Sequence, residues 1–460
     1  MKTMKYAFDV TNTLLVMGLV GVLGGCVTER TQPAEVPKVY EKTLDNGLKV
    51  LVKPDTRAPI VVSQIWYKVG GSYEQEGKTG LSHVLEHMMF KGTSSMGPNE
   101  FSRVIAELGG RENAFTGRDY TAYFQTLEKS HLETAFKLEA ERMHDLILDP
   151  DEFRKELEVV KEERRSRTDD RPESLTYERF MAVAYPESSY HNPIVGWPED
   201  LDAMQVADLR AWYQSFYTPN NATLVVVGDA EPARVFELAE KHFGPLSRRQ
   251  VPRFEDHAES AQSSPRRIEV KAAAKVPYLL LGYHVPVIAT AGEAEEWVPY
   301  ALEVAAYLLD GGKSARLNSE LVNKQRIAAS VGVGYDPVAR KSTMFLFSGN
   351  PSRGTPVDAL ESAIKEQIRI MQDETVSQEE LARVKAQIIA SKVYEQDSGF
   401  YQGMRLGILE TNGLPWQLGD VIHQRLRSVT TEQVREVVKR YLNDDNSTAA
   451  VLVPETAGEG

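Results

Sequence analysis

Residues 210–227 read RAWYQSFYTPNNATLVVV, and residues 434–453 repeat the pattern as VREVVKRYLNDDNSTAAVLV. In each copy, an amphipathic helix is followed by a polar turn and an apolar run typical of a buried strand. The lead-ins also correspond, because 430–433 has the form of a capping box and stands where 204–208 stands in the first copy. A repeat separated by more than two hundred residues indicates two similar domains and not a solenoid.

The chain of 460 residues is long enough for two large domains. A polar stretch marked by prolines, 245–267, has few periodic apolar positions and is the expected boundary. We expect the following organisation: a signal peptide at 1–25, a tether at 26–38, a first domain at 39–245, a linker at 246–267 and a second domain at 268–455.

Each half mixes apolar strand patterns with longer helical patterns. Strands are expected at 48–53, 60–66 and 278–285, and helices at 132–148 and 377–393. This mixture predicts an α+β fold of two similar domains from an internal duplication, each a largely antiparallel sheet packed with helices. The first copy alone contains candidate zinc ligands.

The five residues from His83 to His87 read HVLEH. In a helix, positions i, i+3 and i+4 share a face, so His83, Glu86 and His87 project together. Two imidazoles suit one Zn²⁺, and Glu86 is placed to take a proton from an attacking water. Lone histidines are usually surface or satisfied core residues, and two ligands do not complete a zinc site.

A third ligand is expected on a downstream helix running to Arg167, with Asp149 as N-cap and Pro150 at the first helical position. Its candidate carboxylates are Glu156 and, two turns later, Glu163. The alternative is a solvated face on which glutamates alternate with lysines and arginines. Spacing alone does not choose between Glu162 and Glu163.

With these motifs, the chain resembles the pitrilysin/insulinase family of inverted zincins, and most closely its shorter members that are similar to mitochondrial processing peptidase. The resemblance implies a zinc metalloendopeptidase that forms half of a clamshell. It assigns Glu163 as the third ligand of a single zinc ion per chain, Glu156 as a carboxylate supporting the ligands, and Glu86 as the catalytic base. The segments 70–74 and 80–82 also resemble the family's approach to the zinc helix.

The run GGRENAFT at 109–116 resembles another family signature. In relatives it forms an exposed sheet edge on which the substrate peptide lies as an added strand. The resemblance therefore implies substrate contacts at four successive residues: Asn113, Ala114, Phe115 and Thr116. Without it, they would be an ordinary strand start, with the next strand at 119–124.

One departure from the family concerns its partner domain. Active relatives carry an arginine and a tyrosine seven residues apart that face the zinc from the opposite half, whereas the corresponding positions here are Val322 and Ala329. We therefore expect a two-subunit enzyme in which a metal-free homologue supplies the arginine and tyrosine. The alternative is a non-catalytic peptide-binding or assembly subunit. Dedicated maturation of one secreted peptide would differ only in substrate.

The N-terminus has Lys2 and Lys5 ahead of an apolar stretch, 14–23, too short to span a bilayer. The following LGGC resembles a bacterial lipoprotein box, in which Cys26, the single cysteine, becomes lipidated. This predicts a lipid-anchored periplasmic protein. The expected location is the outer membrane, because Val27 is not the aspartate that is associated with inner-membrane retention in some enteric bacteria. The alternative is an ordinary signal peptide with an incidental cysteine. A net charge of −13 argues against a nucleic-acid partner.

Overall fold

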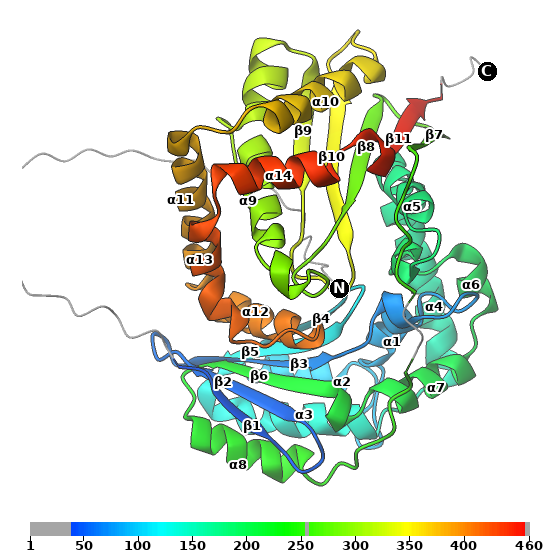
Figure 1. Cartoon of the computed structure of the whole chain (residues 1–460). Helices are drawn as coiled ribbons and strands as arrows, with labels where there is room; N and C mark the ends of the chain where they lie inside the picture. The colour runs from blue at the N-terminus through cyan, green and yellow to red at the C-terminus, as the bar shows by residue number, and fades with distance from the viewer. Residues whose placement is uncertain (1–37, 254–256, 456–460) are drawn as a thin grey trace, which may run out of the picture. The chain divides into compact units, whose positions relative to one another are not determined.

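The computed structural model describes residues 38–253 and 257–455. Cys26 and the expected signal peptide lie outside this part of the chain. The described residues contain two sheets, each covered by helices (Figure 1). They also contain no helix that is long and apolar enough to cross a membrane.

The first sheet has six strands in the order β1-β2-β6-β3-β5-β4. The β2–β6 pair is parallel and the other four pairs are antiparallel. The strands are β1 (Tyr40–Thr43), β2 (Lys49–Pro54), β3 (Ile60–Tyr67), β4 (Arg111–Thr116), β5 (Thr121–Glu128) and β6 (Ala222–Gly228). The helices of this half are α1 (Leu81–Met88), α2 (Glu100–Glu107), α3 (Leu132–His144), α4 (Pro150–Arg164), α5 (Pro172–Ala184), α6 (Pro198–Ala203), α7 (Val206–Phe216) and α8 (Pro232–Phe243).

The second sheet has five strands in the order β7-β11-β8-β10-β9, and again one pair, β7–β11, is parallel. Its strands are β7 (Arg266–Ala272), β8 (Tyr278–Val285), β9 (Ala328–Gly334), β10 (Thr343–Pro351) and β11 (Ser447–Pro454). Its helices are α9 (Val298–Asp310), α10 (Val357–Asp373), α11 (Gln378–Glu395), α12 (Gly399–Thr411), α13 (Leu418–Ser428) and α14 (Thr431–Tyr441). The predicted α+β fold of two largely antiparallel halves is confirmed.

The internal repeat is present in three dimensions. α7 and α14 have the same length of 11 residues, and each leads through a short 3-10 turn into the strand that pairs in parallel, β6 or β11. The predicted capping box at the start of α14 forms between Thr430 and Gln433. In the first copy, the Asp208 carboxylate accepts a hydrogen bond of 3.0 Å from the Gln205 N–H.

Some predicted boundaries differ from the structure. The helix expected at 132–148 ends at His144, because Leu146 is extended and pairs with Thr93. The helix expected to run to Arg167 is α-helical to Arg164 and continues as a π-helical turn, Arg165–Asp169. Strand β7 begins at Arg266, inside the expected linker. The domain boundaries themselves remain predictions.

The strand β6 is buried on both faces, which explains its largely apolar sequence. Leu224 and Val226 belong to the core under the helices of the first half. Val225 and Val227 face the opposite way and form a smaller cluster with Trp66 and with α12, which comes from the second half. Figure 1 shows α12 crossing this sheet.

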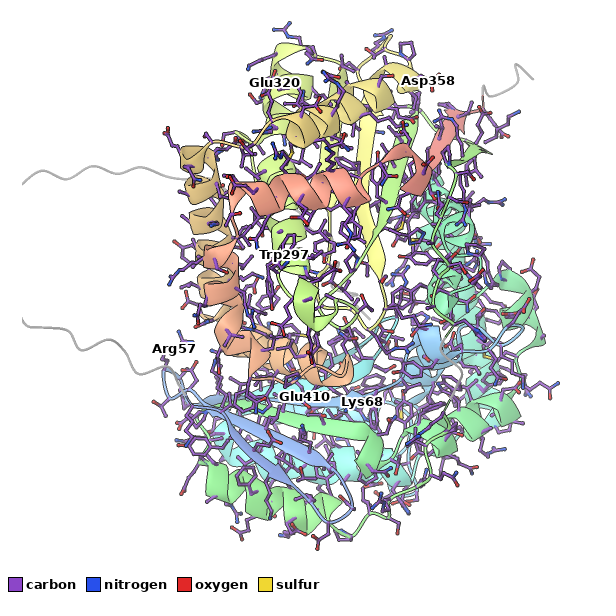
Figure 2. The ribbon with its side chains drawn as sticks, in the orientation of Figure 1. Arg57, Lys68, Trp297, Glu320, Asp358 and Glu410 are labelled. Atoms are coloured by element: carbon purple, nitrogen blue, oxygen red, sulfur yellow. The ribbon has the colours of Figure 1, made fainter. Side chains whose placement is uncertain are left out.

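Packing of a helix from one half on the sheet of the other half also occurs in the opposite direction. Helix α5 of the first half packs on β11, β7 and β8 of the second sheet, where Phe180 and Met181 meet Leu280 and Met344. Polar contacts accompany the α12 crossing: Glu410 accepts a hydrogen bond from Lys49 Nζ at 2.8 Å. Figure 2 shows Glu410 beside Lys68, at the end of β3. Each half thus stabilises the other.

Two glycines of α12 allow its close approach to the first sheet. A Cβ at Gly407 would lie 2.1 Å from Trp66 Cε2, and one at Gly403 would lie 2.8 Å from the Gln64 amide. Trp66 is fully buried, so it has no space in which to move. The small side chains at these positions are therefore required by packing.

We expect Gly407→Ala to destabilise the protein by about 2 kcal/mol or more, because overpacking here outweighs the helix propensity of alanine. Gly399→Ala is the matched control, since its Cβ would meet neighbours no closer than 3.6 Å. Urea denaturation of the two variants measures the difference. An unchanged midpoint for Gly407→Ala would contradict the close α12 packing.

Candidate metal centre and active site

The helix α1, which carries the HVLEH motif, has an unusual start. Its N-cap, Gly80, has φ of 87°, and the N–H groups of Gly80 and Ser82 donate to the Glu74 carboxylate at 2.7 and 2.6 Å. The carboxylate thus satisfies helix N-terminal donors that lack intrahelical partners. Burial raises the pKa of Glu74 to about 7. Glu74 therefore fixes the start of α1 from outside the helix.

A second constraint at this point is the contact between Gly80 and Gly196. A Cβ at Gly80 would lie 2.7 Å from the Val195 carbonyl oxygen, and one at Gly196 would lie 2.7 Å from the Thr79 carbonyl oxygen. Gly196 also has a positive φ, 93°. Both positions therefore require glycine for conformation and for space.

The helix α4 begins as its sequence predicts. The Asp149 carboxylate accepts hydrogen bonds from the N–H groups of Asp151 and Glu152, and Pro150 occupies the first turn. Its buried face consists of Phe153, Glu156, Leu157, Val160 and Arg164. The helix packs against α1, so Glu156 on this face is presented to the HVLEH motif.

The structure brings His83 and His87 together with Glu163. Glu163 Oε2 lies 3.6 Å from His83 Nε2 and 3.4 Å from His87 Nε2. Among the residues that the structure describes, these three are the one group of histidine, cysteine or acidic side chains arranged to hold a metal ion. Glu162 instead pairs with the exposed Arg165. The geometry thus separates two glutamates that spacing alone left equivalent.

The three donor atoms fit a tetrahedral zinc site. With bonds of about 2.0–2.2 Å to nitrogen and oxygen, tetrahedral ligand atoms lie about 3.4 Å apart. The separations to Glu163 Oε2, 3.4 and 3.6 Å, agree with that spacing. Two nitrogens and one carboxylate oxygen also match the donor set of hydrolytic zinc sites, which leave a fourth position open.

Charged side chains around the three candidate ligands hold two of them in place. His87 Nδ1 lies 3.2 Å from Glu156 Oε2, and the other Glu156 oxygen pairs with Lys91 Nζ at 2.6 Å. This contact leaves His87 Nε2 directed at the site, as a supporting carboxylate does for a metal-bound histidine. Arg167 pairs with Glu163 Oε1. His83 Nδ1 is buried without a hydrogen-bond partner in the described structure.

The two histidines have opposite pKa shifts. Burial, with the neighbouring His87, lowers the pKa of His83 to about 4. Burial also opposes a charge on His87, but hydrogen bonds with Glu156 and Glu163 outweigh it and raise its pKa to about 9. Likewise, burial is outweighed at Glu163 by His87 and nearby positive charge, which lower its pKa to about 2. The carboxylates thus favour a positive charge at this position.

Glu86 has an environment suited to proton transfer. It lies on α1 between the histidines and accepts a hydrogen bond from the Thr116 hydroxyl at 2.5 Å. Burial raises its pKa, although the Thr116 hydrogen bond opposes the rise. A raised carboxyl pKa is closer to the range in which a group can both accept and return a proton near neutral pH.

The predicted substrate residues lie on the edge strand β4, which among the described strands pairs only with β5. Asn113 is exposed, and Ala114, Phe115 and Thr116 are partly buried. Thr116, the last residue of β4, touches Glu86, so the sheet edge ends at the candidate site. Val322 and Ala329 lie in the second half, in a π-helical turn (Asn318–Lys324) and in β9.

Sequence reasoning missed several residues that hold the site. Among them are Glu74, Lys91, Arg164 and Arg167. Lys91 and Arg164 pair with side chains of distant segments, so local pattern gave no signal for them. Arg167 stands four residues after Glu163, and this helical spacing of opposite charges could have indicated their pairing. The role of Thr116 beside Glu86 was also not foreseen, although Thr116 itself was a candidate substrate contact.

Comparison with known proteins gives matches over both halves. The model described as Insulinase (Peptidase family M16) matches residues 49–196, and the one described as Peptidase M16 inactive domain matches residues 203–388. The zinc protease PqqE of Helicobacter pylori is 31% identical over 424 residues, covering 91% of this chain and 94% of that protein. An uncharacterized zinc protease of Bacillus subtilis, YmxG, is 24% identical over 410 residues, covering 89% and 97%.

Solved structures show the same fold. The crystal structure of a protease from Helicobacter pylori superimposes with a TM-score of 0.86 at 30% identity, covering 91% of this chain and 100% of that chain. The periplasmic protease PqqL from Escherichia coli superimposes with a TM-score of 0.74 at 20% identity. In that case the match covers 91% of this chain but 48% of the longer PqqL chain.

Proposed function

This chain belongs to the insulinase family, peptidase family M16, and we propose that it is a zinc metalloendopeptidase of the inverted-zincin type. The observation that carries the proposal is the convergence of His83, His87 and Glu163 on one point, with Glu86 on the same helix face. Relatives named as zinc proteases support the metal. One zinc ion per chain is proposed.

His83, His87 and Glu163 would hold the zinc. When bound, zinc supplies a Lewis acid that lowers the pKa of a water molecule and stabilises negative charge on a polarised carbonyl oxygen. Glu86 accepts the proton of the attacking water while Thr116 holds one of its oxygens. The protonated Glu86 then donates to the leaving amine. Burial, which raises the pKa of Glu86, favours the first transfer, from water to the carboxylate.

The substrate in this proposal is an extended peptide or unfolded polypeptide. It would add a strand to the open edge of β4 along Asn113, Ala114, Phe115 and Thr116. Main-chain hydrogen bonds then provide affinity without a strict sequence requirement. The contact between Thr116 and Glu86 would align the scissile bond of the added strand with Glu86.

We expect Glu86→Gln to keep zinc and to lose peptide hydrolysis by about 100-fold or more, because an amide cannot accept the proton. Glu163→Gln should lose zinc first, because the carboxylate ligand is removed. Glu162→Gln is the matched control and should keep both. Zinc content and hydrolysis of an unfolded peptide are the measurements. Retention of zinc and activity by both Glu86→Gln and Glu163→Gln would contradict the assignment.

We further propose that the active enzyme has two subunits. Val322 and Ala329 stand where the resemblance implies an arginine and a tyrosine, so a metal-free homologue would supply that pair across the cleft. The size of PqqL supports the idea, since this chain corresponds to about half of that longer protein. The homologue's arginine and tyrosine would hold the substrate and its developing oxyanion.

If this is correct, the purified zinc-loaded chain will hydrolyse peptides slowly, and adding the homologue will raise kcat/KM about 100-fold or more, the usual range for restoring oxyanion stabilisation. The same mixture made with Glu86→Gln should stay inactive. Full activity of the chain alone would reject the two-subunit proposal. Absence of zinc from the wild-type chain would instead favour the non-catalytic binding subunit.

The proposed location is the periplasm, with a lipid on Cys26 anchoring the chain to the outer membrane. The support is the sequence LGGC after a short apolar stretch. Several acyl chains would give stable anchoring.

Cys26→Ala should move the protein from the membrane fraction to the soluble fraction, because the lipid attachment site is lost. Immunoblotting of separated inner membrane, outer membrane and periplasm measures this, with Cys26→Ser as a second variant. Membrane association that persists in both variants would contradict the anchor.

A further inference from the structure

The sequence RRSR at 164–167 places three arginines at the end of α4, and each has different surroundings. The guanidinium of Arg164 is buried and forms two hydrogen bonds of 2.8 Å with the Glu178 carboxylate. It also donates to the Gly196 carbonyl oxygen at 2.9 Å. Since Gly196 packs against Gly80, Arg164 connects the end of α4 with the start of α1.

Arg165 and Arg167 are both largely exposed, and each pairs with a glutamate of α4. Arg165 pairs with Glu162, whose side chain is 60% exposed. Arg167 pairs with Glu163, whose side chain is 15% exposed. The two arginines are thus chemically alike and two residues apart, but only Arg167 contacts a candidate ligand.

The two oxygens of Glu163 have separate partners. Oε1 pairs with Arg167, whereas Oε2 faces His83 Nε2 and His87 Nε2. Arg167 lies in the π-helical turn Arg165–Asp169, which begins immediately after the buried Arg164. Short π-helical turns within helices occur often at functional sites. Here the turn holds the cation next to the carboxylate.

The positive charge of Arg167, taken alone, would not favour zinc binding. A guanidinium beside a metal site repels the incoming cation, although solvent screens an exposed side chain. Its directional contact with one oxygen has the opposite effect, because it removes freedom that Glu163 would otherwise lose on binding. The outcome depends on which of the two effects is larger.

We infer that Arg167 is a positioning residue: by holding Glu163 Oε1, it presents Oε2 to zinc as a single, oriented ligand atom. The inference rests on the proposed zinc site. It gives the exposed end of α4 a role in metal affinity. Glu156 has a similar role for a second candidate ligand, because it contacts His87 Nδ1. Loss of such supporting contacts typically weakens metal affinity by about 10–100-fold.

The test is the zinc dissociation constant of the whole soluble chain, measured by competition with a chromogenic chelator. Arg167→Ala should raise Kd about 10-fold or more, and Arg165→Ala should leave it unchanged. Arg167→Lys keeps the charge but loses the planar fork of donors, so an intermediate Kd is expected. Thermal unfolding of the metal-free variants checks that the fold is retained.

An unchanged or lower Kd for Arg167→Ala would overturn the inference, because repulsion would then equal or exceed positioning. An unchanged Kd with a raised KM would also overturn it and place Arg167 on the substrate. In both cases the wild-type chain still binds zinc, so the proposed function stands. If the wild-type chain itself binds no zinc, the proposed function fails and the inference falls with it.

Discussion

The candidate site depends on one constraint, the close approach of Gly80 and Gly196. Neither residue can carry a Cβ there without meeting backbone atoms at 2.7 Å. This contact fixes where α1 begins, and Glu74 and Arg164 hold its two sides through buried hydrogen bonds. Because α1 carries both histidines and α4 carries Glu163, the geometry of the three donors follows from how these two helices meet.

The second half of the chain contributes to the site indirectly. Helix α12 closes one face of the first sheet over Trp66, and helix α5 closes the matching face of the second sheet. The first sheet, whose edge strand β4 ends at Thr116, is therefore buried on both faces along the central strand β6. Both halves have the same layout, yet the described residues hold candidate metal ligands only in the first.

Much of the fold could be predicted from the sequence, because the relevant signals are local. The apolar run 278–285 matches β8 at both ends, and the Thr430 capping box forms as its residues indicate. The face of α1 follows from helical periodicity alone. The choice of Glu163 over Glu162 needed the family resemblance, because both residues lie near the end of one helix. The packing of α5 on the second sheet and of α12 on the first was not predicted, since packing between distant segments leaves no local pattern.

The coordination of the bound metal is the sharpest test of the proposed zinc site. X-ray absorption at the zinc edge, combined with anomalous diffraction from crystals of the zinc-loaded chain, gives both the ligand types and their positions. We predict one zinc ion bound by two imidazole nitrogens and one carboxylate oxygen, with the anomalous peak between His83, His87 and Glu163. A peak elsewhere, or coordination that lacks either histidine, would contradict it.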